Sequence, residues 1–158
     1  MSEQASLFRR IVTPVASSRP GGWLYVNVFP YIDRPLMKLT GGRISTGGRG
    51  LVGTLRVTGA RSGIERQTPL AYTRDGETIL LVASRGGDVK HPAWYRNLLA
   101  SPEVGFSIDG EERLYTAREA EGAERERAWR LVNRTYAGFA NYQKRAGRLI
   151  PVMVLEPR

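Results

Sequence analysis

Short runs of alternating apolar and polar side chains fill residues 51–120, and turn signals separate them. The alternation is clear at 51–58 and 104–108, and the dipeptides Asp75-Gly76 and Asp109-Gly110 are typical of hairpin turns. This pattern constrains the fold most, because strands joined by hairpins build an antiparallel sheet rather than a parallel one.

Six strands are expected, over 51–58, 65–73, 78–84, 104–108, 112–120 and 149–155. The continuous apolar run 78–84 predicts a strand buried on both faces, and Pro69 places its strand at an edge or a bulge. Helices are expected between Pro92 and Pro102, over 121–135 and over 137–145. Strands in meander order with late helices predict an α+β, mainly β fold, a six-stranded antiparallel split β-barrel with flanking helices.

The N-terminal third differs from the rest of the chain. Residues 1–44 are expected to form a basic and aromatic segment, and residues 45–158 the barrel domain. The apolar run Trp23–Ile32 is too short to span a membrane, but its basic flanks suit an acidic membrane surface. No secretory pattern opens the chain, so a cytoplasmic location is expected, with peripheral contact at the inner face of the membrane.

The composition limits the kinds of ligand and partner that the chain can bind. Cysteine is absent and His91 is the only histidine, which excludes zinc fingers, iron–sulfur clusters and multi-histidine sites, so no metal is expected. Lys and Arg number 24 against 15 Asp and Glu, a net charge of +9 that favours nucleic acid, a phosphate-bearing cofactor or acidic lipid. The chain lacks the aromatic strand motif of RNA-binding domains, so no nucleic-acid partner is expected.

Residues 84–92 combine features of an anion site. Ser84 ends a predicted strand, Gly86 and Gly87 let the backbone approach a ligand, and the helix that starts near Pro92 directs free N–H groups toward it. Arg85 and Lys90 add positive charge. The alternative is a flexible solvated turn. A second cationic turn, 58–63 with Arg61 and Arg66, would join this site if the barrel places the two turns side by side.

The neighbouring polar and aromatic residues have ordinary explanations as well. His91 is expected to cap the helix or face solvent, with acid–base work as the alternative. Trp94 and Leu98 share a helix face, which favours core packing, while Asn97 could bond a ligand or the backbone. Three aromatics at steps of three could line a pocket, although such a stripe is more often core. These aromatics are Tyr136, Phe139 and Tyr142.

Six motifs in order resemble one known family. They are Thr58-Gly-Ala-Arg-Ser-Gly, Arg66-Gln-Thr-Pro-Leu, Ala83-Ser-Arg-Gly-Gly, Lys90-His-Pro-Ala-Trp-Tyr-Arg-Asn-Leu, Tyr136-Ala-Gly-Phe-Ala-Asn-Tyr-Gln and Ile150-Pro-Val. Together they resemble the deazaflavin-dependent nitroreductase family, which includes actinobacterial quinone reductases. The resemblance covers about residues 45–157. It implies a split β-barrel of the flavin/deazaflavin oxidoreductase superfamily that binds coenzyme F420, an 8-hydroxy-5-deazaflavin with a phosphate and an oligoglutamate tail.

The resemblance also implies residue roles. The cofactor-binding residues would be Arg61, Arg66, Pro69, Ser84, Arg85, Gly86, Gly87, Lys90, Trp94, Asn97 and Tyr142. The phosphate and tail would be held by the arginines and Asn97. Ser84 would lie near the deazaflavin ring and, with Tyr136, is the catalytic candidate to polarise or protonate the acceptor. The substrate pocket would be formed by Tyr72, Trp94, Tyr136 and Phe139.

Some positions depart from the family. Arg85 stands where lysine is frequent, which keeps the charge but changes the donor geometry. Substrate-side tyrosines of some members fall at Ala71, next to Tyr72, and at Phe139, which lacks the hydroxyl. Tyrosine-assisted nitro reduction therefore does not follow from the motifs.

The expected function is hydride transfer from reduced F420 to a lipophilic electrophile. Acceptors consistent with the resemblance are a quinone, a nitro compound, an enone and an unsaturated fatty-acyl compound. One alternative is a split-barrel oxidoreductase that uses FMN or FAD, and another is a lipid or cofactor carrier at the membrane surface. A monomer and a homodimer are both compatible with the sequence.

Overall fold

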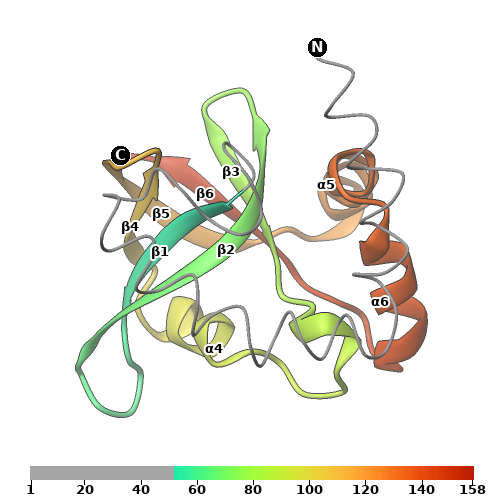
Figure 1. Cartoon of the computed structure of the whole chain (residues 1–158), viewed down its shortest axis with the longest axis horizontal. Coiled ribbons are helices and arrows are strands. Elements are labelled where there is room, and N and C mark those ends of the chain that lie inside the picture. The colour runs from blue at the N-terminus through green and yellow to red at the C-terminus, as the bar shows by residue number, and fades with distance from the viewer. Residues whose placement is uncertain (1–51) are drawn as a thin grey trace.

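The computed structural model describes residues 52–158 (Figure 1). The predicted N-terminal segment 1–44 and residues 45–51 of the predicted barrel domain lie outside the described residues. Within the described part of the chain, six strands close into a barrel, and no helix is long and apolar enough to cross a membrane.

The elements follow the expected order along the chain. The strands are β1 (Val52–Thr58), β2 (Glu65–Asp75), β3 (Thr78–Val82), β4 (Glu103–Ile108), β5 (Glu111–Glu119) and β6 (Val152–Pro157). The helices are the 3-10 turn η1 (Arg85–Gly87) and the α-helices α4 (Ala93–Ala100), α5 (Gly122–Thr135) and α6 (Gly138–Ala146). The last strand starts three residues later than predicted. Gln143 explains the delay, because its side chain bonds the carbonyl of Arg148 and the N–H of Ile150 in place of a strand partner.

The predicted meander order is wrong. All pairs are antiparallel, but the order around the barrel is β1-β2-β3-β6-β5-β4. β6 inserts between β3 and β5, and β4 closes the barrel against β1. Hairpin turns join only β1 to β2, β2 to β3 and β4 to β5, so the other neighbours are chosen by packing.

Burial explains why β3 and β6 pair. Ile79 and Leu81 of β3 point into the barrel, while Leu80 points outward into a second apolar cluster. β6 repeats this arrangement, with Met153 inside and Val154 outside. Two strands that are apolar on both faces need cover on both sides, and α5 and α6 pack over their outer face (Figure 1). The prediction of a doubly buried strand at 78–84 is therefore confirmed for β3.

Strand pairing in the closed barrel has a gap beside β2. Residues 65–71 of β2 pair with β1, whereas only 72–75 pair with β3. Among the described residues, Pro69 lies in the half of β2 with a single strand partner, which agrees with the predicted edge position. One end of the barrel is closed by α4, whose Trp94 and Leu98 join the interior cluster. The loop between β3 and α4 thus leaves the barrel next to this open edge.

Candidate functional site

The loop after β3 makes a left-handed turn. Arg85, Gly86 and Gly87 have φ angles of +47°, +65° and +83°. Glycine adopts this conformation freely, but a residue with a side chain is destabilised by about 1–2 kcal/mol. Arg85 is therefore strained, and a strained residue persists only where its surroundings fix it, a situation common at ligand sites.

Gly87 brings this loop against α6. A Cβ atom at Gly87 would lie 3.1 Å from both the Cα and the carbonyl oxygen of Tyr142. The sequence suggested that the paired glycines make room for a ligand. The structure shows that Gly87 makes room for a neighbouring helix, so the loop and α6 form one unit.

The second cationic turn is tied to α4. Asn97 accepts a hydrogen bond at Oδ1 from the Ala60 N–H, at 3.1 Å. Arg66 reaches back over the base of this turn, where its Nε lies 3.8 Å from the Cβ position of Gly59. Asn97 is one helical turn, about 6 Å, from Ala93 at the start of α4. The turn that carries Arg61 and the loop that carries Arg85 therefore both adjoin the first part of α4.

Several cations elsewhere on the protein are neutralised by ion pairs, whereas most cations of these two segments are not. Arg56, Arg113, Arg118, Arg127 and Arg158 each pair with a carboxylate. Arg61, Arg66 and Lys90 are exposed and form no ion pair with another described residue. Arg85 has one partner, Asp88, at 3.5 Å. The arrangement offers an outside anion several positive charges that are not already neutralised.

The three spaced aromatics gather at the start of α6. The Tyr136 and Tyr142 hydroxyls lie 3.2 Å apart, and the Phe139 ring stands edge-on to Tyr136 at 5.1 Å. Phe139 and Tyr142 are buried in the helix-covered cluster, which confirms the core interpretation of their spacing, while Tyr136 is only half-buried. Burial raises the pKa of Tyr142, so its hydroxyl keeps its proton at neutral pH.

The predicted pocket residues divide between two clusters. Tyr72 and Trp94 are both 8% exposed and belong to the barrel interior, where Tyr72 packs edge-on against Phe106. Tyr136 and Phe139 belong to the cluster under α5 and α6. These four side chains thus belong to two different buried clusters. Tyr72 is a core residue of the barrel here.

Ser84 and Pro69 lie at the margin of the barrel core. Ser84 is 8% exposed and accepts the Gly87 N–H at its carbonyl, which closes η1. Pro69 is half-buried at the split edge of β2. Both therefore lie beside the loop or the open edge rather than inside the barrel core.

Gly138→Ala should displace the Tyr136 ring with little loss of stability. A Cβ at this position would lie 2.3 Å from Tyr136 Cζ, and a ring at the end of a side chain can swing away. The free energy of unfolding should change by less than about 1.5 kcal/mol in thermal unfolding, because only a half-buried ring at the end of a side chain has to move. Tyrosine fluorescence should report a more solvent-exposed Tyr136. An unchanged tyrosine spectrum would contradict this placement.

Comparison with known proteins decides the family. Residues 34–157 match the sequence profile of F420H2-dependent quinone reductases. The chain belongs to the F420H2-dependent quinone reductase family. The enzyme is thus an oxidoreductase, and its cofactor is coenzyme F420.

Individual relatives agree with the profile. An F420H2-dependent quinone reductase from Mycobacterium tuberculosis is 41% identical over 107 residues, which are 66% of this chain and 72% of that protein. The solved structure of an F420-H2 dependent reductase, FDR-A, is 40% identical with a TM-score of 0.64 and covers 68% of this chain and 96% of its own. A solved domain-swapped dimer is 36% identical with a TM-score of 0.66 and covers 87% and 99%. The predicted family and split-barrel fold are confirmed.

The described residues fit an F420-type ligand. A phosphate and a glutamate tail are anions, and the enzyme offers exposed cations at Arg61, Arg66 and Lys90 that have no ion-pair partner within residues 52–158. A helix start lies between the two cationic segments, since α4 begins at Ala93 without a side-chain cap on its N–H groups. Charge and backbone donors of this kind match an acidic ligand end.

Sequence reasoning missed two arginines that organise the site. Arg145 donates from Nη2 to the Gly86 carbonyl, at 3.1 Å, and lies over the Tyr142 ring. Arg148 donates to the carbonyls of Ala83, Val89 and Lys90. These contacts join segments about sixty residues apart, and no local sequence pattern predicts them.

His91 neither caps α4 nor simply faces solvent, which corrects the sequence expectation. Pro92 occupies the N-cap, and the half-buried imidazole stacks on Tyr95 at 4.8 Å. Tyr95 in turn donates its hydroxyl proton to Glu119 at 2.7 Å. His91 Nδ1 is buried without a hydrogen-bond partner. Burial lowers the pKa of His91, and the positive charge of Arg148 lowers it further.

The free energy of unfolding should therefore fall on mild acidification. A histidine whose pKa is lowered by folding binds its proton more readily in the unfolded chain. His91 should not affect the free energy of unfolding well above pH 6.5. The free energy of unfolding should drop as the pH falls below that value, because the unfolded chain then binds the proton first. Urea unfolding between pH 7.5 and 5 should show a steeper loss for the wild type than for His91→Gln. An equal loss of stability with falling pH in the two proteins would contradict the half-buried placement of the imidazole.

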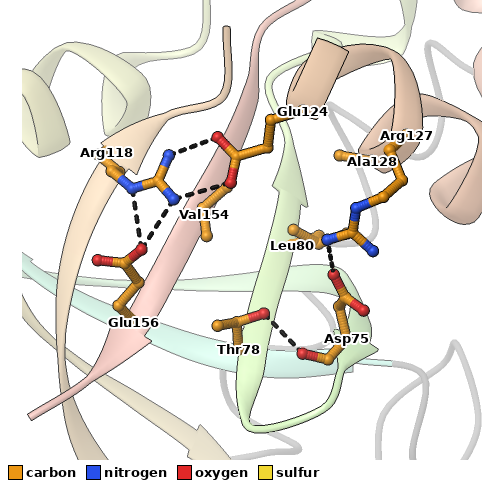
Figure 2. A pocket seen from close by; sticks show the side chains of 9 residues that line it. All are labelled: Asp75, Thr78, Leu80, Arg118, Glu124, Arg127, Ala128, Val154 and Glu156. Carbon is orange, nitrogen blue, oxygen red and sulfur yellow. Dashed lines mark hydrogen bonds and ion pairs between the residues drawn. The ribbon is translucent and has the colours of Figure 1, made fainter.

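A separate hollow lies between α5 and the outer surface of β3, β5 and β6 (Figure 2). Its volume is about 260 Å³, and none of the predicted site residues lines it. Arg118 binds Glu124 and Glu156 at 2.6 and 2.8 Å, and Arg127 binds Asp75. The charges around the hollow thus neutralise one another, and these ion pairs hold α5 against the barrel.

Proposed function

We propose that this enzyme uses reduced F420 to reduce a lipophilic quinone, and that the acidic end of F420 binds along the start of α4. The observation that carries the proposal is the set of exposed cations on the two segments that adjoin this helix, of which Arg61, Arg66 and Lys90 form no ion pair with another described residue. Arg61 and Arg66 would bind from one side, and Arg85 and Lys90 from the other. The quinone is the acceptor after which the matching family is named.

Each residue has a defined part in this mechanism. Bound F420 supplies the hydride. The cationic segments bind and orient the acidic end, while Ser84 lies at the base of the loop, where its hydroxyl can bond a polar ring atom or the acceptor. Tyr136 is half-buried, and its hydroxyl contacts that of Tyr142. This pair can hold the proton that accompanies the hydride onto a quinone oxygen.

Fluorescence titration tests the cofactor site first. The protein should bind F420 and reject FMN and FAD at matched concentrations. Steady-state assays with reduced F420 should then compare a menaquinone analogue with a nitroimidazole, an enone and an unsaturated fatty-acyl ester. Fastest turnover of the quinone supports the proposal, whereas a preference for another acceptor overturns its substrate assignment.

Contact with an acidic membrane and a dimer are consistent with this function. Val89 and Leu149 are 69% and 64% exposed and lie close together, since Arg148 bonds the Val89 carbonyl. Exposed Lys90 and Lys144 add positive charge on the neighbouring loop and helix. Apolar tips among cations suit an anionic lipid surface that holds quinones. Sedimentation with phosphatidylglycerol vesicles tests this contact, and light scattering tests whether the enzyme dimerises like its domain-swapped relative.

A further inference from the structure

Arg148 lies in the turn that follows α6, directly after Gly147 at the helix C-cap. Its Nη2 donates to the carbonyls of Ala83 and Lys90, both at 3.2 Å, and its Nε donates to the Val89 carbonyl at 3.1 Å. One guanidinium thus holds both ends of the loop 84–90, and most of its donors are used within the protein.

The loop needs such a constraint. Its turn contains the strained Arg85 and two glycines, which lose more conformational freedom than other residues when they are ordered. Arg145 holds the middle of the loop through the Gly86 carbonyl, and Arg148 holds the ends. Fixed points just before the loop, in its middle and at its end define the position of Arg85 and Lys90, the two cations that the loop contributes.

We infer that Arg148 is a positioning residue for the cofactor, which fixes the loop 84–90 in the conformation that binds the acidic end of F420. This inference rests on the proposed function. Arg148 acts through the loop, since its donors point to backbone carbonyls rather than to the exposed surface where Arg85 and Lys90 lie. A loop ordered before binding spares the ligand the entropic cost of ordering it.

The geometry requires arginine at this position. A planar guanidinium presents five N–H donors in fixed directions and can serve three carbonyls at once. Lysine keeps the charge but concentrates its donors on one atom, so it cannot span both ends of the loop. Arg148→Lys is therefore the informative substitution, because it separates hydrogen-bond geometry from charge.

The matched control is Arg125→Lys. Arg125 is also a partly buried arginine that donates to a backbone carbonyl, that of Ile150 at 3.0 Å. It packs over Trp129 in α5 and has no contact with the loop 84–90 among the described residues. Any general cost of replacing a buried arginine should appear equally in this variant.

Hydrogen exchange of the full-length protein without cofactor tests the loop directly. Amides 84–91 should exchange at least about ten-fold faster in Arg148→Lys than in the wild type, since two or more hydrogen bonds are lost, and should be unchanged in Arg125→Lys. Equal exchange in the two variants would overturn the inference.

Binding and turnover give the second readout. Arg148→Lys should weaken F420 binding about ten-fold or more, while kcat at saturating F420 stays within about two-fold. A loss of kcat with unchanged affinity would overturn the positioning role. If the wild type binds no F420, the proposed function fails, whereas faster loop exchange in the variant would still show that Arg148 orders this loop.

The single histidine provides an internal check of the geometry. His91 follows the loop, and the charge of Arg148 lowers its pKa. Arg148→Met should therefore raise the pKa of His91, and Arg125→Met should leave it unchanged. Proton NMR can follow this titration without ambiguity because the chain contains one histidine. An unchanged His91 titration in Arg148→Met would place Arg148 away from the loop and overturn the inference.

Discussion

Simultaneous replacement of Arg66 and Arg85 by alanine should weaken F420 binding about 10²–10⁴-fold. Each substitution removes a charge-assisted contact of about 1.5–3 kcal/mol, and about 1.4 kcal/mol corresponds to a factor of ten in affinity. The fold should be unaffected, since Arg66 has no described ion pair and the exposed Arg85–Asp88 pair adds little stability. Fluorescence titration with F420 measures the change.

A control must separate local contact from overall charge. Arg74→Ala with Arg130→Ala removes the same two charges from exposed positions on β2 and α5, outside the cationic segments. This control should bind F420 with nearly wild-type affinity at physiological salt, because charges beyond a Debye length of about 8 Å are largely screened. Equal weakening in the two double variants would mean that net charge attracts the ligand and would reject the assigned site.

Local signals predicted the elements well. The Asp-Gly turns at 75–76 and 109–110, the alternation at 104–108 and the prolines around α4 act within a few residues, so their consequences are visible in the sequence. The order of strands around the barrel depends on which faces are buried together, and alternation cannot distinguish among several antiparallel arrangements. The position of β6 was therefore missed, although the apolar run in β3 already required cover on both faces.

Sequence patterns also predicted only part of the candidate site. Motif order identified the family and the two cationic segments. The Asn97–Ala60 bond places the turn 58–63 beside α4, and the loop 84–90 leads into the start of that helix along the chain. The predicted pocket did not specify which cluster each aromatic joins, because Tyr72 lies on a strand and Tyr136 precedes a helix that packs elsewhere. The role of Arg148 could not be predicted from the sequence, since its acceptors are backbone carbonyls, which every residue type carries.

Gly87→Ala should have the largest effect of any small substitution in the site. The positive φ of +83° disfavours alanine by about 1–2 kcal/mol. The added methyl group would also approach the Tyr142 backbone to 3.1 Å and Arg145 Nε to 3.2 Å, which adds about 1–3 kcal/mol of overpacking. The sum lowers the free energy of unfolding by about 2–5 kcal/mol and moves the loop away from α6.

Gly76→Ala isolates the contact from the backbone strain. Gly76 has a similar φ of +62°, but nothing lies within 4 Å of its Cβ position, in the turn between β2 and β3. The Gly76→Ala variant should lose about 1–2 kcal/mol of the free energy of unfolding, measured in urea, and should keep its F420 affinity. Gly87→Ala should lose more stability and bind F420 at least about ten-fold more weakly, because the shifted loop carries Arg85. Equal stability losses with unchanged affinity in both variants would show that the loop does not depend on close packing against α6. The cationic loop would then have to be ordered by its ligand rather than before it.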